Sequence, residues 1–513
     1  MFVSIDSACV QGIQGELVRV ETDVVNGLPC TELIGLNGKV ANESKERVRS
    51  AIRNAGFSFP MQRIVIHVSP ADMKKEGSHF DLPIAMGILA ASKQCNVSQD
   101  EQGEFIWLGA LALSGEVQPV KGILPMVMKA QKQGVKGVVL PKQNALEAMA
   151  VKGIRIIAIS HLKEAVSFLK NTTQTVFDCS DMTATMKKRK EAHSFDFSDI
   201  KGQQEAKRAL EIAAAGNHAC LLIGSPGSGK TALAKRLPSI LPEMCQKEAV
   251  ETSVIYSVSG RMEPESGLLY TRPFRAPHHS ITGAALIGGG HVPAPGEVSL
   301  AHNGVLFLDE INEMQSNVLE LLREPLEEQF VRISRKEGTI QYPANFMLVA
   351  AANPCKCGML LEERYPCTCT PGEITRYGKQ LSGALLDRID LRVEVRATAL
   401  KTLHQNMPQE NSATIRKRVM QARIRQRKRF AREGISCNGQ MTHEMAERYV
   451  PLSAEAFLLL QKFEKQFVFS PRGYLSVLRV ARTIADLEEC EVTTAHIAEA
   501  LQYRVPEQGG VYA

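Results

Sequence analysis

The sequence contains no apolar run of the roughly 18–20 residues that a membrane-spanning helix needs. Its first residues, 1–6, have neither the basic segment nor the long apolar stretch of a secretory signal peptide. There is no tandem repeat and no long low-complexity tract. These absences argue against membrane, exported and repeat proteins, and we expect a cytoplasmic protein without a membrane partner.

The composition is that of a globular protein with more than one domain. Single cores rarely grow past about 250–300 residues, and this chain has 513 residues, of which 44% are hydrophobic and 23% charged. The net charge of +6 is modest and says nothing by itself about nucleic acid. Twelve cysteines in a large cytoplasmic chain indicate free thiols or metal ligands rather than disulfides.

The clearest chemical signal is a phosphate-binding loop at residues 224–231. It follows the apolar run 219–223 and leads into the helical pattern of residues 231–237, as the G-x-x-x-x-G-K-[ST] template requires. Backbone N–H groups of such a loop point at phosphate oxygens, the lysine reaches the β/γ-phosphates, and the threonine ligates Mg²⁺. The candidate nucleotide-binding residues are Gly224, Ser225, Pro226, Gly227, Ser228, Gly229, Lys230 and Thr231.

A second segment completes the requirements for nucleotide hydrolysis. The apolar run 305–308 ends in Asp309 and Glu310. Asp309, at the end of a buried strand, is placed to hold Mg²⁺ together with Thr231. Glu310 is placed to polarise a water molecule for attack on the γ-phosphate, which is general-base chemistry. The sequence therefore predicts an ATPase that uses ATP and Mg²⁺.

A cysteine cluster predicts a zinc site. Two C-x-C pairs, separated by nine residues, provide four thiolates that can surround Zn²⁺ tetrahedrally. Four protein ligands leave no position for water, so the site is structural rather than catalytic; the alternative is a set of free thiols. The candidate ligands are Cys355, Cys357, Cys367 and Cys369.

The chain divides into three regions and a linker. Residues 1–170 alternate strand and helix patterns, and residues 171–197 form a polar linker with a basic run. Residues 198–397 read as a nucleotide-binding α/β domain, and residues 398–513 are dominated by helical periodicity.

Four segments carry a family resemblance. Residues 197–203 resemble the opening of AAA+ ATPase modules, residues 348–355 resemble the sensor 1 strand, residues 381–390 the arginine-finger segment, and residues 470–473 sensor 2. Together they resemble the magnesium-chelatase-like family of AAA+ ATPases, of the ComM/YifB type, nearly end to end.

The resemblance implies an α/β AAA+ core with a helical C-terminal lid and four catalytic residues: Glu310, Asn353, Arg388 and Arg472. Asn353 would contact the γ-phosphate or the attacking water. Arg388 would act on ATP held by a neighbouring subunit, so the implied assembly is a ring, a homo-hexamer. For Arg388 the alternative is an ordinary ion pair with a neighbouring aspartate.

Three basic or glycine-rich segments point to DNA as the substrate. Residues 281–299 lie where this family carries an insert that projects into the ring pore, and residues 329–342 predict a β-hairpin with a basic tip. Residues 415–432 predict a helix with nine basic residues and no acid. A solvated hairpin tip and a helix face that pairs with acidic neighbours are the alternatives. The candidate DNA contacts are Arg332, Arg335, Lys336, Arg423 and Arg427.

The N-terminal region resembles the catalytic domain of Lon proteases, an α+β fold of the ribosomal S5 domain 2 type, around residues 80–86 and 107–124. In this resemblance Asp81 stands at the position of the serine nucleophile and Leu124 at that of the lysine base. Neither residue can do that chemistry, so we predict no peptidase activity and expect an assembly or DNA-contacting platform.

The leading hypothesis is therefore an ATP-driven ring that moves on single-stranded and branched DNA. By resemblance it would be a branch-migration helicase that extends recombination joints in natural transformation, with recombinase or competence proteins as partners. The alternatives are a magnesium-chelatase-like metal-insertion motor and a protein-remodelling ATPase. DNA that fails to stimulate ATP hydrolysis would favour the alternatives.

Overall fold

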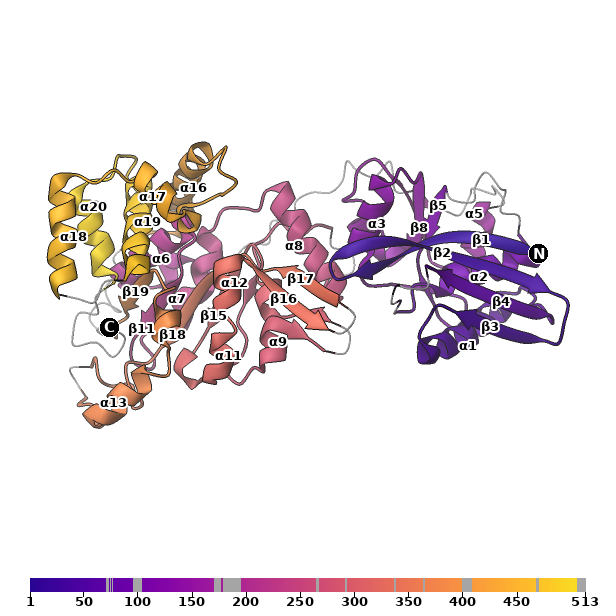
Figure 1. The fold of residues 1–513 in the computed structure, drawn as a ribbon, viewed down its shortest axis with the longest axis horizontal. Coiled ribbons are helices and arrows are strands. Elements are labelled where there is room, and N and C mark those ends of the chain that lie inside the picture. The colour runs from indigo at the N-terminus through magenta and orange to yellow at the C-terminus, as the bar shows by residue number, and fades with distance from the viewer. Residues whose placement is uncertain are drawn as a thin grey trace. The chain divides into compact units, whose positions relative to one another are not determined.

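The computed structural model covers residues 1–513 and describes all of them except 71–72, 74, 76, 96–103, 170–176, 179–194, 264–266, 291–292, 336–337, 363–364, 399–407, 467–469 and 505–513. Most of the predicted linker and Lys336 lie outside the described residues. The chain forms two compact units. The first comprises residues 1–189, 246–270 and 336–341, and the second comprises the remainder (Figure 1).

The first unit is built on a mixed eight-stranded sheet. Its strand order is β10-β9-β8-β5-β1-β2-β4-β3. The strands are β1 (Phe2–Gln11), β2 (Gln14–Val25), β3 (Cys30–Ile34), β4 (Arg63–Ser69), β5 (Phe105–Trp107), β8 (Gly137–Pro141), β9 (Arg155–Ile159) and β10 (Phe177–Asp178). A small separate pair consists of β6 (Ala110–Leu111) and β7 (Val117–Gln118).

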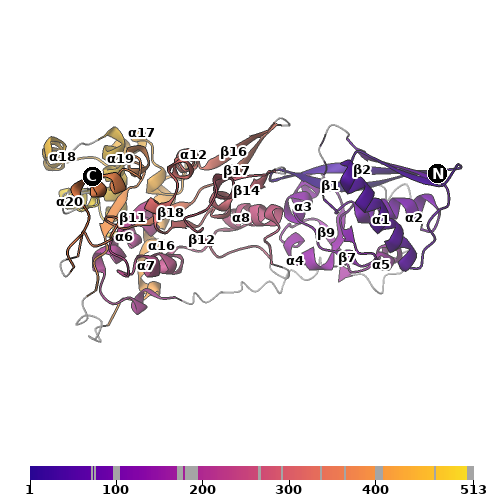
Figure 2. The ribbon, with the colours of Figure 1, turned by 90° about the horizontal axis from the view of Figure 1, so that it is seen from below.

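Alternation of apolar residues explains why the longer strands form. Val18, Val20 and Val24 of β2 are buried, whereas Arg19 and Val25 between and beyond them are exposed, as expected for a strand with one covered face. The helices are α1 (Gly38–Asn54), α2 (Asp81–Ala91), α3 (Ile123–Lys132), α4 (Ala145–Ala148), α5 (Leu162–Leu169) and α8 (Gln246–Ser259). Helices α1 and α2 pack together, and α2 contacts β1 and β2 (Figure 2).

Helix α8 joins this unit although it follows the phosphate loop in sequence. It packs on α3, where the carbonyl of Ser257 accepts a hydrogen bond from the N–H of Gly122 at 3.0 Å. The Oγ of Ser257 lies 3.4 Å from the N–H of Leu124. The predicted contiguous ATPase region thus contributes one helix to the other compact unit.

A buried carboxylate fixes the start of α2. Every residue of this helix is buried, and the Asp81 side chain accepts hydrogen bonds from Ser44 Oγ at 2.6 Å and from Arg47 Nε at 2.7 Å. The N–H of Leu111 lies 3.3 Å from its second oxygen. Asp81 is therefore an anchor between α1 and α2, while the resemblance to Lon proteases and the lack of peptidase activity stay predictions.

The second unit contains a fully parallel five-stranded sheet in the order β12-β15-β18-β11-β19. Its central strands are buried on both faces, as parallel sheets require. The strands are β11 (Cys220–Ile223), β12 (Phe274–Arg275), β15 (Val305–Leu308), β18 (Met347–Ala352) and β19 (Leu391–Glu394). A further pair in this unit is β13 (Gly288–Gly289) with β14 (Ala294–Pro295). Strand β16 (Phe330–Arg335) pairs with β17 (Gly338–Pro343), of which residues 338–341 are assigned to the first unit.

Helices complete this unit and form its C-terminal region. The core helices are α6 (Gln204–Gly216), α7 (Lys230–Arg236), α9 (Gly283–Ile287), α10 (Glu297–Leu300), α11 (Ser316–Glu320), α12 (Arg323–Glu328), α13 (Pro371–Gly378) and α14 (Gly383–Leu386). The C-terminal helices are α16 (Ser412–Arg429), α17 (His443–Tyr449), α18 (Ala454–Gln466), α19 (Pro471–Leu487) and α20 (Thr494–Gln502). Helices α17 to α20 gather at one end of the unit in both views. The predicted α/β core with a helical C-terminal region is confirmed. In the described part of the chain, no helix is both long and apolar enough to cross a bilayer.

The Asp81 anchor gives a test of the first unit. Asp81→Ala leaves Arg47 and Ser44 without their buried acceptor, and we expect it to lower the free energy of unfolding by about 2–4 kcal/mol. The only tryptophan of the sequence, Trp107, is buried in this unit, so its fluorescence in urea reports on this unit alone. Asp6→Ala is the control, because Asp6 pairs with the exposed Arg19; such a pair contributes about 0–1 kcal/mol. Equal shifts for both variants would contradict the anchoring role.

Candidate nucleotide-binding site

Parallel pairing brings the predicted site residues together. Ile223 of β11 lies opposite Ala352 of β18, and Leu308 of β15 lies opposite Ala350. The residues that follow these strands are Gly224, Asn353 and Asp309. Because the carboxyl ends of parallel strands meet at one edge, the phosphate loop, the carboxylate and the amide share that edge.

The Lys230 ammonium is held inside the loop. Its Nζ donates to the carbonyls of Gly224 at 2.6 Å and Ser225 at 2.9 Å, and it lies 3.3 Å from Oδ1 of Asn353. The side chain is buried, and burial lowers the pKa of Lys230 although Asp309 and Glu310 oppose the shift. The loop thus holds a partly desolvated cation beside the predicted sensor residue.

Thr231 and Asp309 form the predicted magnesium pair. Thr231 Oγ1 donates to Asp309 Oδ2 at 2.7 Å. The other oxygen, Oδ1, accepts from the N–H of Glu310 at 3.1 Å. A hydroxyl and a carboxylate at contact distance are the two protein ligands that phosphate-loop enzymes supply to Mg²⁺.

The loop itself has the features of a phosphate cradle. Gly227 and Gly229 adopt φ of +79° and +99°, and a Cβ added at either would meet open space. Ser228 Oγ is buried and, among the described residues, has no hydrogen-bond partner. A bound polyphosphate would supply a hydrogen-bond partner to this buried hydroxyl and fill the open space beside Gly227 and Gly229. The residues present therefore fit ATP and Mg²⁺.

Glu310 adopts an unusual backbone conformation. Its φ of +49° lies in the left-handed region, which costs roughly 1–3 kcal/mol for a residue other than glycine and is common at functional sites. Its Oε2 lies 3.3 Å from Nδ1 of His279, and both side chains are partly exposed. His279 was missed in the sequence, because the motif Pro277-His278-His279 carries no local sign that it meets Glu310.

The two predicted catalytic arginines lie together, held by one carboxylate. Arg388 Nη2 and Arg472 Nη2 both contact Oε1 of Glu327, on α12. Arg388 also donates to the carbonyl of Ala384. In the described part of the chain, neither arginine contacts the phosphate loop.

A buried polar network joins the lid to the core beside Arg388. His218, which precedes β11, lies 2.9 Å from Asp390 Oδ2 and 2.7 Å from Thr483 Oγ1 of α19. Ser476 of α19 donates to Asp390 Oδ1 at 2.6 Å. Burial alone raises the pKa of Asp390, but the hydrogen bonds from His218 and Ser476 hold it below its usual value. Helix α19, the segment around Asp390 and the residue that precedes β11 are thus tied by one network.

The hairpin of β16 and β17 shows the predicted alternation. Val331 and Ile333 are buried, whereas Arg332 and Arg335 are exposed. The Arg332 guanidinium lies 4.6 Å from the ring centroid of Phe330. Tyr342 OH donates to the carbonyl of Pro293 at 2.8 Å, which fastens the hairpin to the predicted pore insert.

Several basic side chains of helix α16 form ion pairs with acidic residues of other segments. Arg418 contacts Glu211 and Glu410, and Arg429 contacts Asp486. These pairs match the alternative in which the helix binds acidic neighbours. The two DNA candidates are placed differently: Arg423 donates to the carbonyl of Ala214 at 3.0 and 3.2 Å, whereas Arg427 is exposed.

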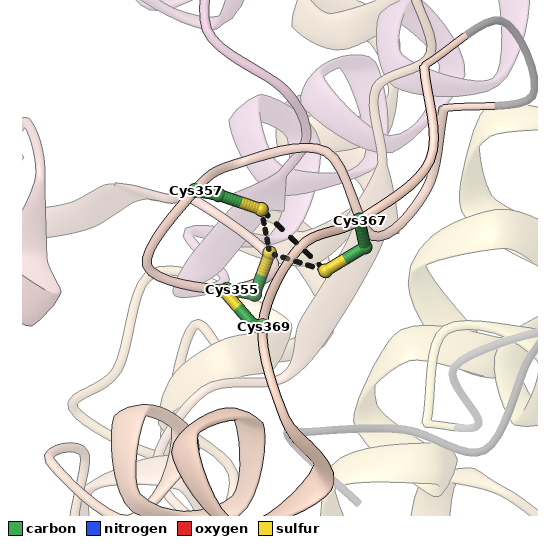
Figure 3. Close-up of side chains that lie close together, drawn as sticks. All are labelled: Cys355, Cys357, Cys367 and Cys369. Carbon is green, nitrogen blue, oxygen red and sulfur yellow. Dashed lines mark hydrogen bonds between the residues drawn. The ribbon is translucent and has the colours of Figure 1, made fainter.

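The four predicted metal ligands converge (Figure 3). Three of their sulfur atoms lie 3.4–3.6 Å apart, and all four Sγ atoms lie within 4.8 Å of one another. Tetrahedral Zn²⁺ with Zn–S bonds of about 2.3 Å separates sulfurs by about 3.8 Å. Burial raises the pKa of Cys355 to about 12, and the N–H of Met359 lowers that of Cys357 to about 5. Four thiol sulfurs at these separations form a donor set that fits Zn²⁺.

This geometry predicts about one zinc ion per chain, lost in Cys367→Ser. The measurement is elemental analysis of protein purified by gel filtration, with Cys30→Ser as control because Cys30 is exposed and outside the cluster. Wild-type protein that binds no more zinc than Cys367→Ser, even after reconstitution, would contradict the site.

Three family models and several relatives match the chain. The model for magnesium chelatase subunit ChlI matches residues 196–403, that for subunit ChlI of Mg-chelatase matches residues 20–144, and that for its C-terminal part matches residues 409–504. The chain is 42% identical to competence protein ComM of Haemophilus influenzae, covering 97% of this chain and 96% of the relative.

It is also 38% identical to the uncharacterized protein YifB of Escherichia coli, over 96% of this chain and 95% of the relative. The magnesium-chelatase 38 kDa subunit of Rhodobacter capsulatus is 25% identical over 57% of this chain and 81% of its own length. The chain therefore belongs to the magnesium-chelatase-like family, of the ComM/YifB type.

Proposed function

We propose that this protein is an ATPase whose hydrolysis site is the edge formed by the phosphate loop, Asp309, Glu310 and Asn353. The observation that carries the proposal is the joint placement of Lys230 on Asn353 and of Thr231 on Asp309. These two pairs join three separate segments, the phosphate loop, Asp309 and Asn353, at the distances that phosphate and Mg²⁺ binding require.

Each residue has a role in that chemistry. The loop N–H groups and Lys230 bind the phosphates, while Thr231 and Asp309 would hold Mg²⁺, which neutralises charge on the phosphate oxygens. Glu310 takes a proton from the attacking water, and Asn353 orients that water. His279, in contact with Glu310, fixes where the carboxylate points.

Arg388 and Arg472 complete the site from another copy of the chain. Their contacts run to Glu327 and Ala384, not to the phosphate loop of the same chain. An arginine supplied in trans can accelerate phosphoryl transfer by about 10³–10⁵-fold. This arrangement supports a ring, which we propose to be a homo-hexamer.

We further propose that the ring moves on single-stranded and branched DNA as a branch-migration helicase that extends recombination joints in natural transformation, with recombinase or competence proteins as partners. The near full-length similarity to a protein named for competence supports this. The exposed Arg332 and Arg335 on the hairpin supply phosphate contacts.

Metal insertion is the second candidate function. The family models and the 38 kDa magnesium-chelatase subunit favour it, but that relative covers only 57% of this chain. A protein-remodelling ATPase is the third candidate. Stimulation of ATP hydrolysis by DNA distinguishes a motor that moves on DNA from both alternatives.

The first test is unwinding of a synthetic three- or four-way DNA junction with ATP and Mg²⁺. We expect activity in the wild type and a loss of about 10²–10⁴-fold in Glu310→Gln, because the general base is removed. Glu324→Gln, an exposed acid on α12, controls for loss of charge. Hydrolysis that is indifferent to DNA, with no unwinding by any variant, would move the assignment to metal insertion or protein remodelling.

The hairpin gives a second test. Each phosphate contact contributes about 0.7–0.9 to the slope of log affinity against log salt, so the double variant Arg332→Ala/Arg335→Ala should reduce the slope by about 1.4–1.8. The matched control is Arg376→Ala/Lys379→Ala, which removes two exposed cations from α13 and the residue that follows it. Equal slopes for the two double variants, measured by fluorescence anisotropy with labelled DNA, would contradict the hairpin contacts.

A further inference from the structure

One carboxylate holds two guanidinium groups that come from distant parts of the chain. Glu327 lies 61 residues before Arg388 and 145 residues before Arg472. Both Nη2 atoms meet the same oxygen, Oε1. The Arg388 side chain is 9% exposed, whereas those of Arg472 and Glu327 are 43% and 39% exposed. The cluster is therefore open to solvent on the side of Arg472 and Glu327.

The cluster has more positive than negative charge. Burial lowers the pKa of Arg388, and the like charge of Arg472 lowers it further. The pKa of Glu327 is lowered by both arginines although burial opposes the shift. Nearby Arg323 is paired with Glu320 at 2.8 Å, so it adds no unbalanced charge. Among the described residues, the buried Nε of Arg388 has no hydrogen-bond partner.

We propose that Glu327 is a positioning residue that occupies, in the unassembled chain, the place of a nucleotide phosphate on Arg388 and Arg472. The inference rests on the proposed ATP hydrolysis between copies. Guanidinium groups recognise carboxylate and phosphate through the same N–H···O geometry. A carboxylate that bridges two arginines therefore keeps like charges together in the arrangement that a phosphate needs.

The same contact makes Glu327 an internal competitor. The terminal phosphate of a nucleoside triphosphate, held in the loop of a second copy, must displace the carboxylate before the arginines can act on it. The phosphate carries more negative charge and more acceptor oxygens than a carboxylate. Assembly then becomes dependent on nucleotide, because an empty neighbouring loop offers nothing to replace Glu327.

The test is the rate of ATP hydrolysis as a function of protein concentration, at saturating ATP and DNA. Glu327→Gln removes the competing charge and should lower the protein concentration for half-maximal activity by about three- to tenfold. Glu327→Asp, which retains the charge, should restore the wild-type value. Glu328→Gln, the next exposed acid on α12, should leave the value unchanged. Thermal unfolding verifies that all variants are folded.

Two results would overturn the proposal. A half-activating concentration in Glu327→Gln equal to that of Glu328→Gln means that the carboxylate does not compete. A loss of activity in Glu327→Gln as deep as in Arg388→Ala means that Glu327 is required in the assembled site. Arg388→Ala distinguishes failure of this inference from failure of the proposed function. Full activity in Arg388→Ala would contradict hydrolysis between copies. Loss of activity in Arg388→Ala, together with no effect of Glu327→Gln, would contradict only the role of Glu327.

Discussion

The parallel pairing of β11, β15 and β18 is the constraint on which the candidate site depends. Each strand leads into a different segment of the candidate site: the phosphate loop, the carboxylates Asp309 and Glu310, and Asn353. The register that places Ile223 opposite Ala352 and Leu308 opposite Ala350 sets the three segments at one edge. A one-residue slip would turn the side chains of a strand to the other face, so the buried register and the chemistry are inseparable.

The lid depends on the same sheet through the buried network around His218. Asp390 follows Arg388 by two residues and Ser476 follows Arg472 by four, so both predicted catalytic arginines lie close in sequence to its members. Buried polar groups of this kind hold a fixed arrangement, since each unmade hydrogen bond costs about 1–3 kcal/mol. The network therefore holds α19 and the segment around Asp390 in a fixed arrangement relative to β11.

The sequence predicted the parts of the site whose geometry is local. The phosphate loop needs a strand, a turn and a helix in succession, and the cysteine pairs need only short spacings. Both can therefore be recognised from the amino-acid sequence. Contacts between distant segments can be recognised only where a motif implies them, as for Thr231 and Asp309. The nine cations of residues 415–432 suggested a free basic face, but Arg418 and Arg429 meet Glu211 and Asp486, far away in the chain.

The same limit applies to Glu327 and His279, whose partners lie on other elements. Helix α8 shows a further limit of sequence reading. Its sequence lies within the ATPase region, yet its packing partner is α3. Position along the chain suggested a contiguous domain, whereas the contacts of this helix place it in the first unit.

The central claim is that ATP bound at one copy's loop is hydrolysed with Arg388 from another copy. The most direct measurement mixes two inactive variants, Lys230→Ala and Arg388→Ala, and follows ATP hydrolysis across mixing ratios. In a mixed ring, an intact loop can meet an intact finger, so the account predicts activity well above that of either variant alone, with a maximum at intermediate ratios. Activity that never exceeds the sum of the two separate rates, although the chains assemble together, would contradict it.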